Sequence, residues 1–274
     1  MEISLNIKDN PHRGYLIVEG ESDRRLFETY FRKRGIEVNN DLNIIAASNI
    51  EVDETVLRRN NLRPHCNKDL IIAFALFCNS ENPVIADNIR CIVDKDCWES
   101  NPYDNDALIV VTDYPAIESY AFDASIFDDL RILFDNKIPS GDVIVEQMKN
   151  KLCYLFSLRK KYSGPADTLP PISYKNVGKE GDFIRNCTNN LCSNSDVKEI
   201  FDSLINKNPK SFAYGHDIAQ VFKHLYKSKA PNKNIHFSDL ELHMLRQLVF
   251  SQTLDSERMF LCLNSWLKSI GCFI

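Results

Sequence analysis

The stretch GYLIVEGESDRRLFETYFRKRG, residues 14–35, joins two different patterns. It opens with a short apolar run of β-forming residues. It then repeats apolar residues at helical spacing and ends in basic residues followed by Gly35. A buried strand followed directly by an amphipathic helix is typical of a β-α unit. At the junction stands Glu19, so the stretch predicts a strand, a helix and a carboxylate presented between them.

The first half of the chain continues this alternation. Residues 67–82 are apolar nearly all round, which predicts a buried helix, with a strand as the alternative. Further short apolar runs predict additional strands, namely residues 42–48, 88–98 and 107–114. Strands that alternate with helices predict an α/β fold with a mainly parallel, Rossmann-like sheet covered on both faces.

Helical periodicity dominates from about residue 125 onward. The residues between 162 and 182 carry several glycines and prolines and predict a long loop. The predicted helices are residues 125–137, 143–162, 197–207, 217–229, 240–252 and 256–270. We therefore expect two domains, an α/β domain over residues 1–124 and a mostly helical C-terminal region over residues 125–274.

Composition limits the possible partners and compartments. The 274-residue chain has a formal net charge of −5, so a nucleic acid would have to be held by local basic segments or by metal ions rather than by overall charge. The chain lacks a secretory signal pattern and a membrane-spanning run, which predicts a cytoplasmic protein without a membrane partner. The nine cysteines lack regular zinc-site spacing, including the pair in 187–192, and buried thiols are the preferred interpretation.

Acidic residues follow three of the predicted strands. Glu19 follows the first strand, Asp94 and Asp96 follow the run RCIV, and Asp113 follows LIVV shortly after. An extended backbone would turn Asp94 and Asp96 to the same side. Neighbouring carboxylates repel each other unless a cation lies between them, so the pattern predicts a site for Mg²⁺, with Mn²⁺ as the alternative. Strand ends that simply emerge into water are the competing interpretation.

Two of these motifs carry a resemblance to a known family. LIVEGESD followed by CIVDKD resembles the Toprim domain of topoisomerases, bacterial primases and OLD-family nucleases. The resemblance implies that Glu19 binds metal and acts in proton transfer, and that Asp94 and Asp96 bind metal. It also matches Asp23 and implies a catalytic role for it, although favourable placement at the positive end of a helix is an equally good interpretation. The distance between the motifs predicts an insertion or an extra helix in residues 52–70.

A narrower resemblance comes from VVTDYPAIESYAF, residues 110–122. This segment is similar to the Toprim effectors of PARIS-type anti-phage defence systems. The resemblance implies that Asp113 and Glu118 complete an acidic pocket, Asp113 as a metal ligand and Glu118 as a catalytic residue. It also implies a toxic nuclease that cleaves transfer RNA after release from a separate ABC-type ATPase sensor subunit. A homodimer is left open. His216, in the Gly-His-Asp element that opens a helix, is a further candidate for proton transfer, with a surface position as the alternative.

Other functions remain open on the sequence. The chain could be an OLD-like DNA nuclease, or a non-catalytic module that binds its partner through the helical region. Basic segments such as LRKKY, residues 158–162, are candidates for holding a nucleic acid, although a single basic run is usually a solvated helix face. A dinucleotide site is excluded because the residues after the first strand lack the Gly-x-Gly-x-x-Gly pattern.

Overall fold

The computed structural model describes residues 12–81, 83–163, 169–175, 177–179, 183, 194–229 and 240–272. The chain forms two compact units. The first unit comprises residues 1–95, 100–113 and 252–274, and the second comprises residues 96–99 and 114–251. The boundary between these units differs from the domain boundary predicted after residue 124. The last segment of the chain, residues 252–274, belongs to the first unit.

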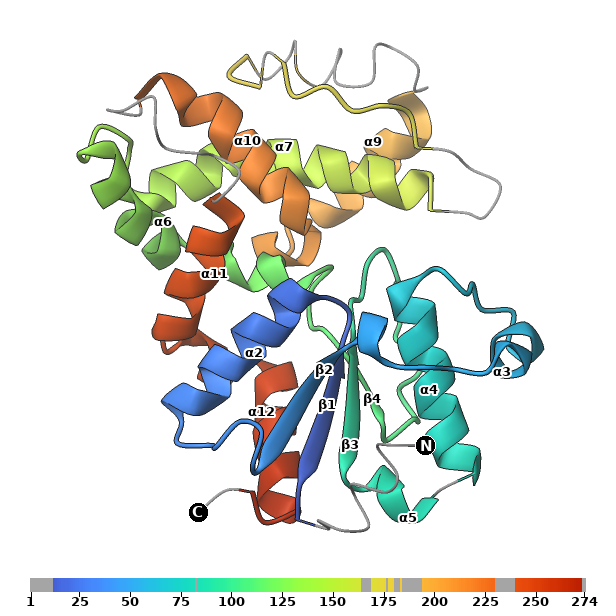
Figure 1. Ribbon diagram of the computed structural model, residues 1–274. Coiled ribbons are helices and arrows are strands. Elements are labelled where there is room, and N and C mark those ends of the chain that lie inside the picture. Colours follow the sequence, from blue (N-terminus) through green and yellow to red (C-terminus); the bar gives the residue numbers. More distant parts are fainter. Residues whose placement is uncertain are drawn as a thin grey trace. The chain divides into compact units, whose positions relative to one another are not determined.

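The first unit is built on a four-stranded, all-parallel sheet with the order β2-β1-β3-β4 (Figure 1). Tyr15 lies opposite Asn43 on one side and opposite Ile89 on the other, so β1 is paired along both of its edges. The strands are β1 (Gly14–Val18), β2 (Leu42–Ala46), β3 (Ile89–Val93) and β4 (Ile109–Val111). The predicted α/β class and the parallel sheet are thereby confirmed.

Helices cover both faces of this sheet (Figure 1). The helices of the first unit are α2 (Glu21–Lys33), α3 (Glu54–Arg59), α4 (Asn67–Glu81), α5 (Pro83–Ala86) and α12 (Arg258–Ser269), with short 3₁₀ turns η1 (Ala47–Asn49) and η7 (Thr253–Ser256). Helix α4 confirms the helical interpretation of residues 67–82 over the strand alternative. Helix α3 lies within residues 52–70, where the resemblance predicts an insertion or an extra helix.

The core of the first unit explains why these elements form. All five residues of β1 are buried, as expected for a strand with covered faces. Helix α2 turns its apolar stripe inward, where the ring of Phe27 lies 5.7 Å from that of Phe260 in α12. The hydroxyl of Tyr30 donates to Asp255 at 3.0 Å and accepts from Asn264 at 3.1 Å. Aromatic packing and these polar contacts together hold α12 against α2.

The second unit is helical. The helices are α6 (Ala124–Leu130), α7 (Gly141–Lys161), α9 (Asn194–Leu204), α10 (Gly215–Tyr226) and α11 (Leu240–Phe250), with 3₁₀ segments η2 (Ile117–Ala121), η3 (Arg131–Phe134), η4 (Pro209–Phe212) and η5 (Lys227–Lys229). Each helix predicted for the C-terminal half is present, and the last of them, α12, belongs to the first unit. Residues 169–175 and 177–179, within the predicted long loop, have neither helix nor strand; the other residues of 164–182 lie outside the described residues.

Besides the strand predicted over residues 42–48, which ends at Ala46, two predicted strands are shorter than the ranges expected for them. The strand predicted over residues 88–98 ends at Val93, and the strand predicted over 107–114 covers only Ile109–Val111. In the first case the chain turns where its polar residues begin, because Asp96 adopts a left-handed backbone conformation with φ = 49°. Among the helices in the described part of the chain, none combines the length and apolarity needed to cross a bilayer.

Gly141 gives a direct test of the packing in the second unit. A Cβ atom at this position would lie 1.8 Å from the backbone oxygen of Ala124, so α7 could no longer approach the start of α6. We expect Gly141→Ala to lower the free energy of unfolding by about 3 kcal/mol, as overpacking against a backbone atom does. Gly178→Ala is the matched control, because nothing lies within 4 Å of a Cβ there. Equal urea midpoints for the two variants would contradict this packing.

Candidate functional site

Two of the predicted acids meet at the carboxyl edge of the sheet. Glu19 follows β1, Asp94 follows β3, and these two strands are parallel neighbours. Oε1 of Glu19 accepts a hydrogen bond from the backbone N–H of Asp94 at 2.8 Å. The carboxylate of Glu19 thus satisfies a donor at the point where β3 ends, which fixes its orientation next to Asp94. Both residues remain partly exposed, as groups that act on a ligand must be.

Helix α4 contributes two side chains to this edge that the sequence did not single out. The amide of Asn67 donates to the backbone oxygen of Glu19 at 2.9 Å. The Lys68 ammonium group, on a side chain that is almost fully buried, donates to the backbone oxygen of Asp94. A lysine in the first turn of a helix opposes the helix dipole. This unfavourable placement, at the start of an otherwise apolar helix, is the signal that could have identified Lys68.

Asp96 departs from the conformation predicted for it. The expected extended run through Asp94 and Asp96 is wrong, because β3 has ended and Asp96 lies in a turn with positive φ. Period-two alternation therefore does not set the direction of its side chain. In the second unit, the Asp96 N–H donates to the oxygen of Pro115 at 2.8 Å, and its Oδ1 accepts from the hydroxyl of Tyr214 at 3.4 Å.

Asp23 lies in the first turn of α2 and has a clear local role. Its Oδ2 accepts the N–H of Gly20 at 2.9 Å, so it caps the start of the helix that follows Glu19. Burial raises the pKa of Asp23 to about 6, although the hydrogen bond from Gly20 acts in the opposite direction. The capping interaction accounts for an acid at this position, and a catalytic role for Asp23 stays a prediction.

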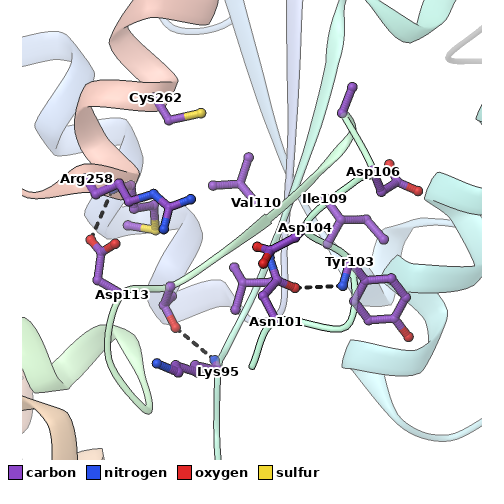
Figure 2. Close-up of a pocket in the computed structure, with 14 residues that line it drawn as sticks. Lys95, Asn101, Tyr103, Asp104, Asp106, Ile109, Val110, Asp113, Arg258 and Cys262 are labelled. Carbon is purple, nitrogen blue, oxygen red and sulfur yellow. Dashed lines mark hydrogen bonds between the residues drawn. The ribbon is translucent and has the colours of Figure 1, made fainter. Parts of the chain in front are cut away.

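Asp113 lines a cavity of about 370 Å³ in the first unit (Figure 2). Its Oδ2 accepts the N–H of Met259 at 3.0 Å, in the first turn of α12, where a carboxylate is favoured by the exposed N–H groups and by the helix dipole. The cavity runs along β4, the last strand in the sheet order, and Figure 2 shows Arg258 and Cys262 of α12 on one side and Tyr103 and Asp106 on the other.

Glu118 lies in the 3₁₀ segment η2. In the second unit its carboxylate approaches the backbone at the start of α10. A Cβ atom added to Gly215 would lie 2.5 Å from Oε2 of Glu118. Next to Glu118, the hydroxyl of Ser119 donates to the backbone oxygen of Ala213 at 2.6 Å. A side chain at position 215 would therefore require the Glu118 side chain to move.

The remaining residues of the Gly-His-Asp element differ sharply in their surroundings. The His216 side chain is 76% exposed, and its Nδ1 lies 3.1 Å from Oε1 of Glu241. Asp217 is fully buried and receives two hydrogen bonds from Arg159, at 2.7 and 2.8 Å. The surface position is therefore confirmed for His216, and its catalytic role stays a prediction. The basic segment 158–162 is not uniformly a solvated face, because Arg159 serves this buried pair.

The donor set at the sheet edge fits a hard divalent cation. In the described parts of the chain, no three His, Cys, Asp or Glu side chains lie together closely enough to hold a metal ion by themselves. Mg²⁺, however, usually keeps several waters and uses one or two carboxylates. Glu19 and Asp94 carry two carboxylates, and Oε1 of Glu19 lies at the Asp94 backbone, so the fit is one of donor chemistry. The pair therefore fits the cation that the sequence predicts.

The described cysteines are free thiols. Cys78, Cys91, Cys153 and Cys272 are buried, which agrees with the interpretation of the cysteines as mostly buried thiols. Burial raises the pKa of Cys78 and Cys153 to about 12, so these two thiols stay protonated near neutral pH. The pair in residues 187–192 lies outside the described residues.

Neither the protein-family models nor the curated proteins compared with the sequence match it. The resemblance to Toprim proteins therefore depends on the quoted motifs and on the arrangement of the residues in them.

The raised pKa of Asp23 leads to a prediction about stability and pH. A carboxyl group whose pKa is higher in the folded protein loses stabilisation as the pH rises from about 4, its unfolded value, through about 6. Asn cannot titrate but can still accept the Gly20 N–H. We expect Asp23→Asn to gain about 1–2 kcal/mol of unfolding free energy relative to the wild type between pH 4.5 and 7.5, measured by urea denaturation.

Asp53→Asn is the control for this effect. The side chain of Asp53 caps α3 by accepting from Thr55, and hydrogen bonds from Thr55 lower its pKa. Its stabilisation is present at neutral pH and is lost on acidification, so the difference for Asp53→Asn should change with pH in the opposite direction. A pH-independent difference for Asp23→Asn would contradict the prediction.

Proposed function

We propose that the protein is a Toprim-type, Mg²⁺-dependent nuclease that hydrolyses phosphodiester bonds in nucleic acid. The observation that carries the proposal is the hydrogen bond between Glu19 and the N–H of Asp94. It brings the Glu-Gly motif and the Asp-x-Asp motif together at the carboxyl edge of a parallel sheet, which is where open α/β sheets bind ligands. Two separate motifs with chemically suitable residues therefore lie at the same edge of the sheet. Polar residues that end strands by chance would not need to lie together.

The proposed site divides its tasks among a few side chains. Glu19 and Asp94 are the ligands for the cation. The resemblance to Toprim domains implies that Asp96 is a further ligand. The bound cation supplies charge stabilisation for the phosphate as negative charge develops on it. Asn67 donates to the backbone oxygen of Glu19, and Lys68 donates to that of Asp94. These contacts keep the two strand ends in place. Glu19 assists proton transfer at the attacking water or at the leaving oxygen.

The biological setting is proposed from the resemblance. The favoured substrate is transfer RNA, and the favoured role is a toxic effector in anti-phage defence, restrained by a separate ABC-type ATPase subunit in the cytoplasm. DNA cleavage of the OLD type is the principal alternative. Asp113 is retained as a candidate metal ligand, and Asp23, Glu118 and His216 are retained as candidate catalytic residues.

The first test is a cleavage assay with the full chain. Purified protein is incubated with bulk transfer RNA and with plasmid DNA, each with Mg²⁺ or with a chelator. We expect Mg²⁺-dependent RNA fragments, and we expect Glu19→Gln to reduce the cleavage rate at least 100-fold because the carboxylate is lost with little change in shape.

Glu21→Gln is the matched control. Glu21 is two residues away and exposed, and its salt bridge to Arg24 on the helix surface contributes little to stability. It should therefore keep wild-type cleavage. Metal-dependent DNA nicking in place of RNA fragments would assign the protein to the OLD-like alternative. Cleavage that survives both chelation and Glu19→Gln would reject the proposed site, and absence of cleavage even with the ATPase subunit added would favour a binding module.

A further inference from the structure

The hydroxyl of Tyr214 contacts one of the proposed metal ligands. Tyr214 is the residue before α10, and its hydroxyl donates to Oδ1 of Asp96 at 3.4 Å. This distance is long for an O–H···O bond, but hydrogen bonds around catalytic groups often tighten only when the ligand is bound. Asp96 lies beyond the end of β3, and its backbone is in the left-handed conformation.

The ring of Tyr214 is itself held from one side. The guanidinium of Arg159, in the last turn of α7, lies over this ring at 4.5 Å from its centre. A stacked guanidinium is attracted to the face of an aromatic ring, more strongly where water is excluded. The Tyr214 ring is thus supported by a cation that is anchored on a different helix.

Arg159 is fixed in turn by a buried carboxylate. Its Nε and Nη2 donate to the two oxygens of Asp217, and the hydroxyl of Tyr174 also donates to Oδ1 of Asp217. Asp217 has no solvent exposure, so its charge depends on these partners. Since Tyr214 and Asp217 lie three residues apart around the start of α10, this buried pair fixes both ends of the turn that presents the Tyr214 hydroxyl.

We infer that Tyr214 is a positioning residue that orients the Asp96 carboxylate for binding a divalent cation, and that the ion pair of Arg159 with the buried Asp217 holds Tyr214 in place. The inference rests on the proposed function, in which Asp96 is a ligand. A hydrogen bond to one carboxylate oxygen restricts rotation of the group and so fixes the direction of the other oxygen. Outer contacts of this kind typically change metal affinity by about 10–100-fold.

The test measures metal affinity separately from cleavage. Mn²⁺ binding to the full chain is measured by titration calorimetry for the wild type and for Tyr214→Phe, which removes only the hydroxyl. We expect Mn²⁺ affinity to fall about 10-fold, with a thermal midpoint close to that of the wild type. Cleavage should recover in part when Mn²⁺ is raised above the new dissociation constant, which a general loss of structure would not allow.

Tyr226→Phe is the matched control. Tyr226 lies at the other end of α10, is buried, and donates its hydroxyl to Gln147 at 2.6 Å. Its loss removes a similar hydrogen bond of the second unit without touching a candidate ligand, so Mn²⁺ affinity should not change. Arg159→Lys should weaken Mn²⁺ binding less than Tyr214→Phe does, because the charge beside Asp217 and the Tyr214 hydroxyl both remain.

A double-mutant cycle makes the assignment specific to Asp96. In an Asp96→Asn background, Tyr214→Phe should have no further effect on Mn²⁺ affinity, because the two changes act on one ligand. An undiminished effect in that background, or wild-type affinity in Tyr214→Phe alone, would overturn the role of Tyr214 while leaving the nuclease proposal intact. A wild-type protein that cleaves nucleic acid but binds no Mn²⁺ would reject the metal site and this inference together.

Discussion

The double pairing of β1 is the constraint on which the first unit depends. This strand is hydrogen-bonded to β2 on one edge and to β3 on the other, and its whole length is buried. A charged side chain is therefore expected only where the strand leaves the sheet. The parallel register brings that point beside the end of β3, so Glu19 reaches the N–H of Asp94. One carboxylate thus satisfies a strand-end donor and presents a charge at the same place.

The main constraint in the second unit is a charged side chain, Asp217, that has no access to water. Asp217 is buried, and an isolated buried carboxylate would be strongly destabilising. The bidentate contact with Arg159 and the hydroxyl of Tyr174 offset that cost. Such pairs add little net stability compared with apolar packing, but they require one geometry. In this protein the geometry that is fixed includes Tyr214, and through it the side chain of Asp96.

Asp96 lies in the turn after β3 and has a left-handed backbone conformation. Non-glycine residues in left-handed conformations are uncommon, although Asp tolerates them better than most residues, and they often occur at functional positions. Strand β3 ends at Val93 and is followed by Asp94, and the backbone becomes left-handed at Asp96. Lys95 lies between the two acids, and its N–H donates to the side chain of Thr112 at 2.8 Å, which ties this turn to the residue after β4.

The sequence by itself determined the elements whose signal is local. Periodicity identified β1, α2, α4 and the helices of the second half, because the residues that a strand or helix buries recur at fixed spacing. It also placed Glu19 and Asp94 at strand ends, and parallel pairing then implied that they would meet. Only the tertiary structure decided which charges are satisfied and by what. The return of α12 to the first unit, the capping of α12 by Asp113, the contact of Lys68 with Asp94 and the burial of Asp217 all join residues far apart in the chain. A single sequence shows that a residue is charged, but the partner that makes its burial or its orientation possible is fixed by packing between distant elements, and no local spacing encodes it.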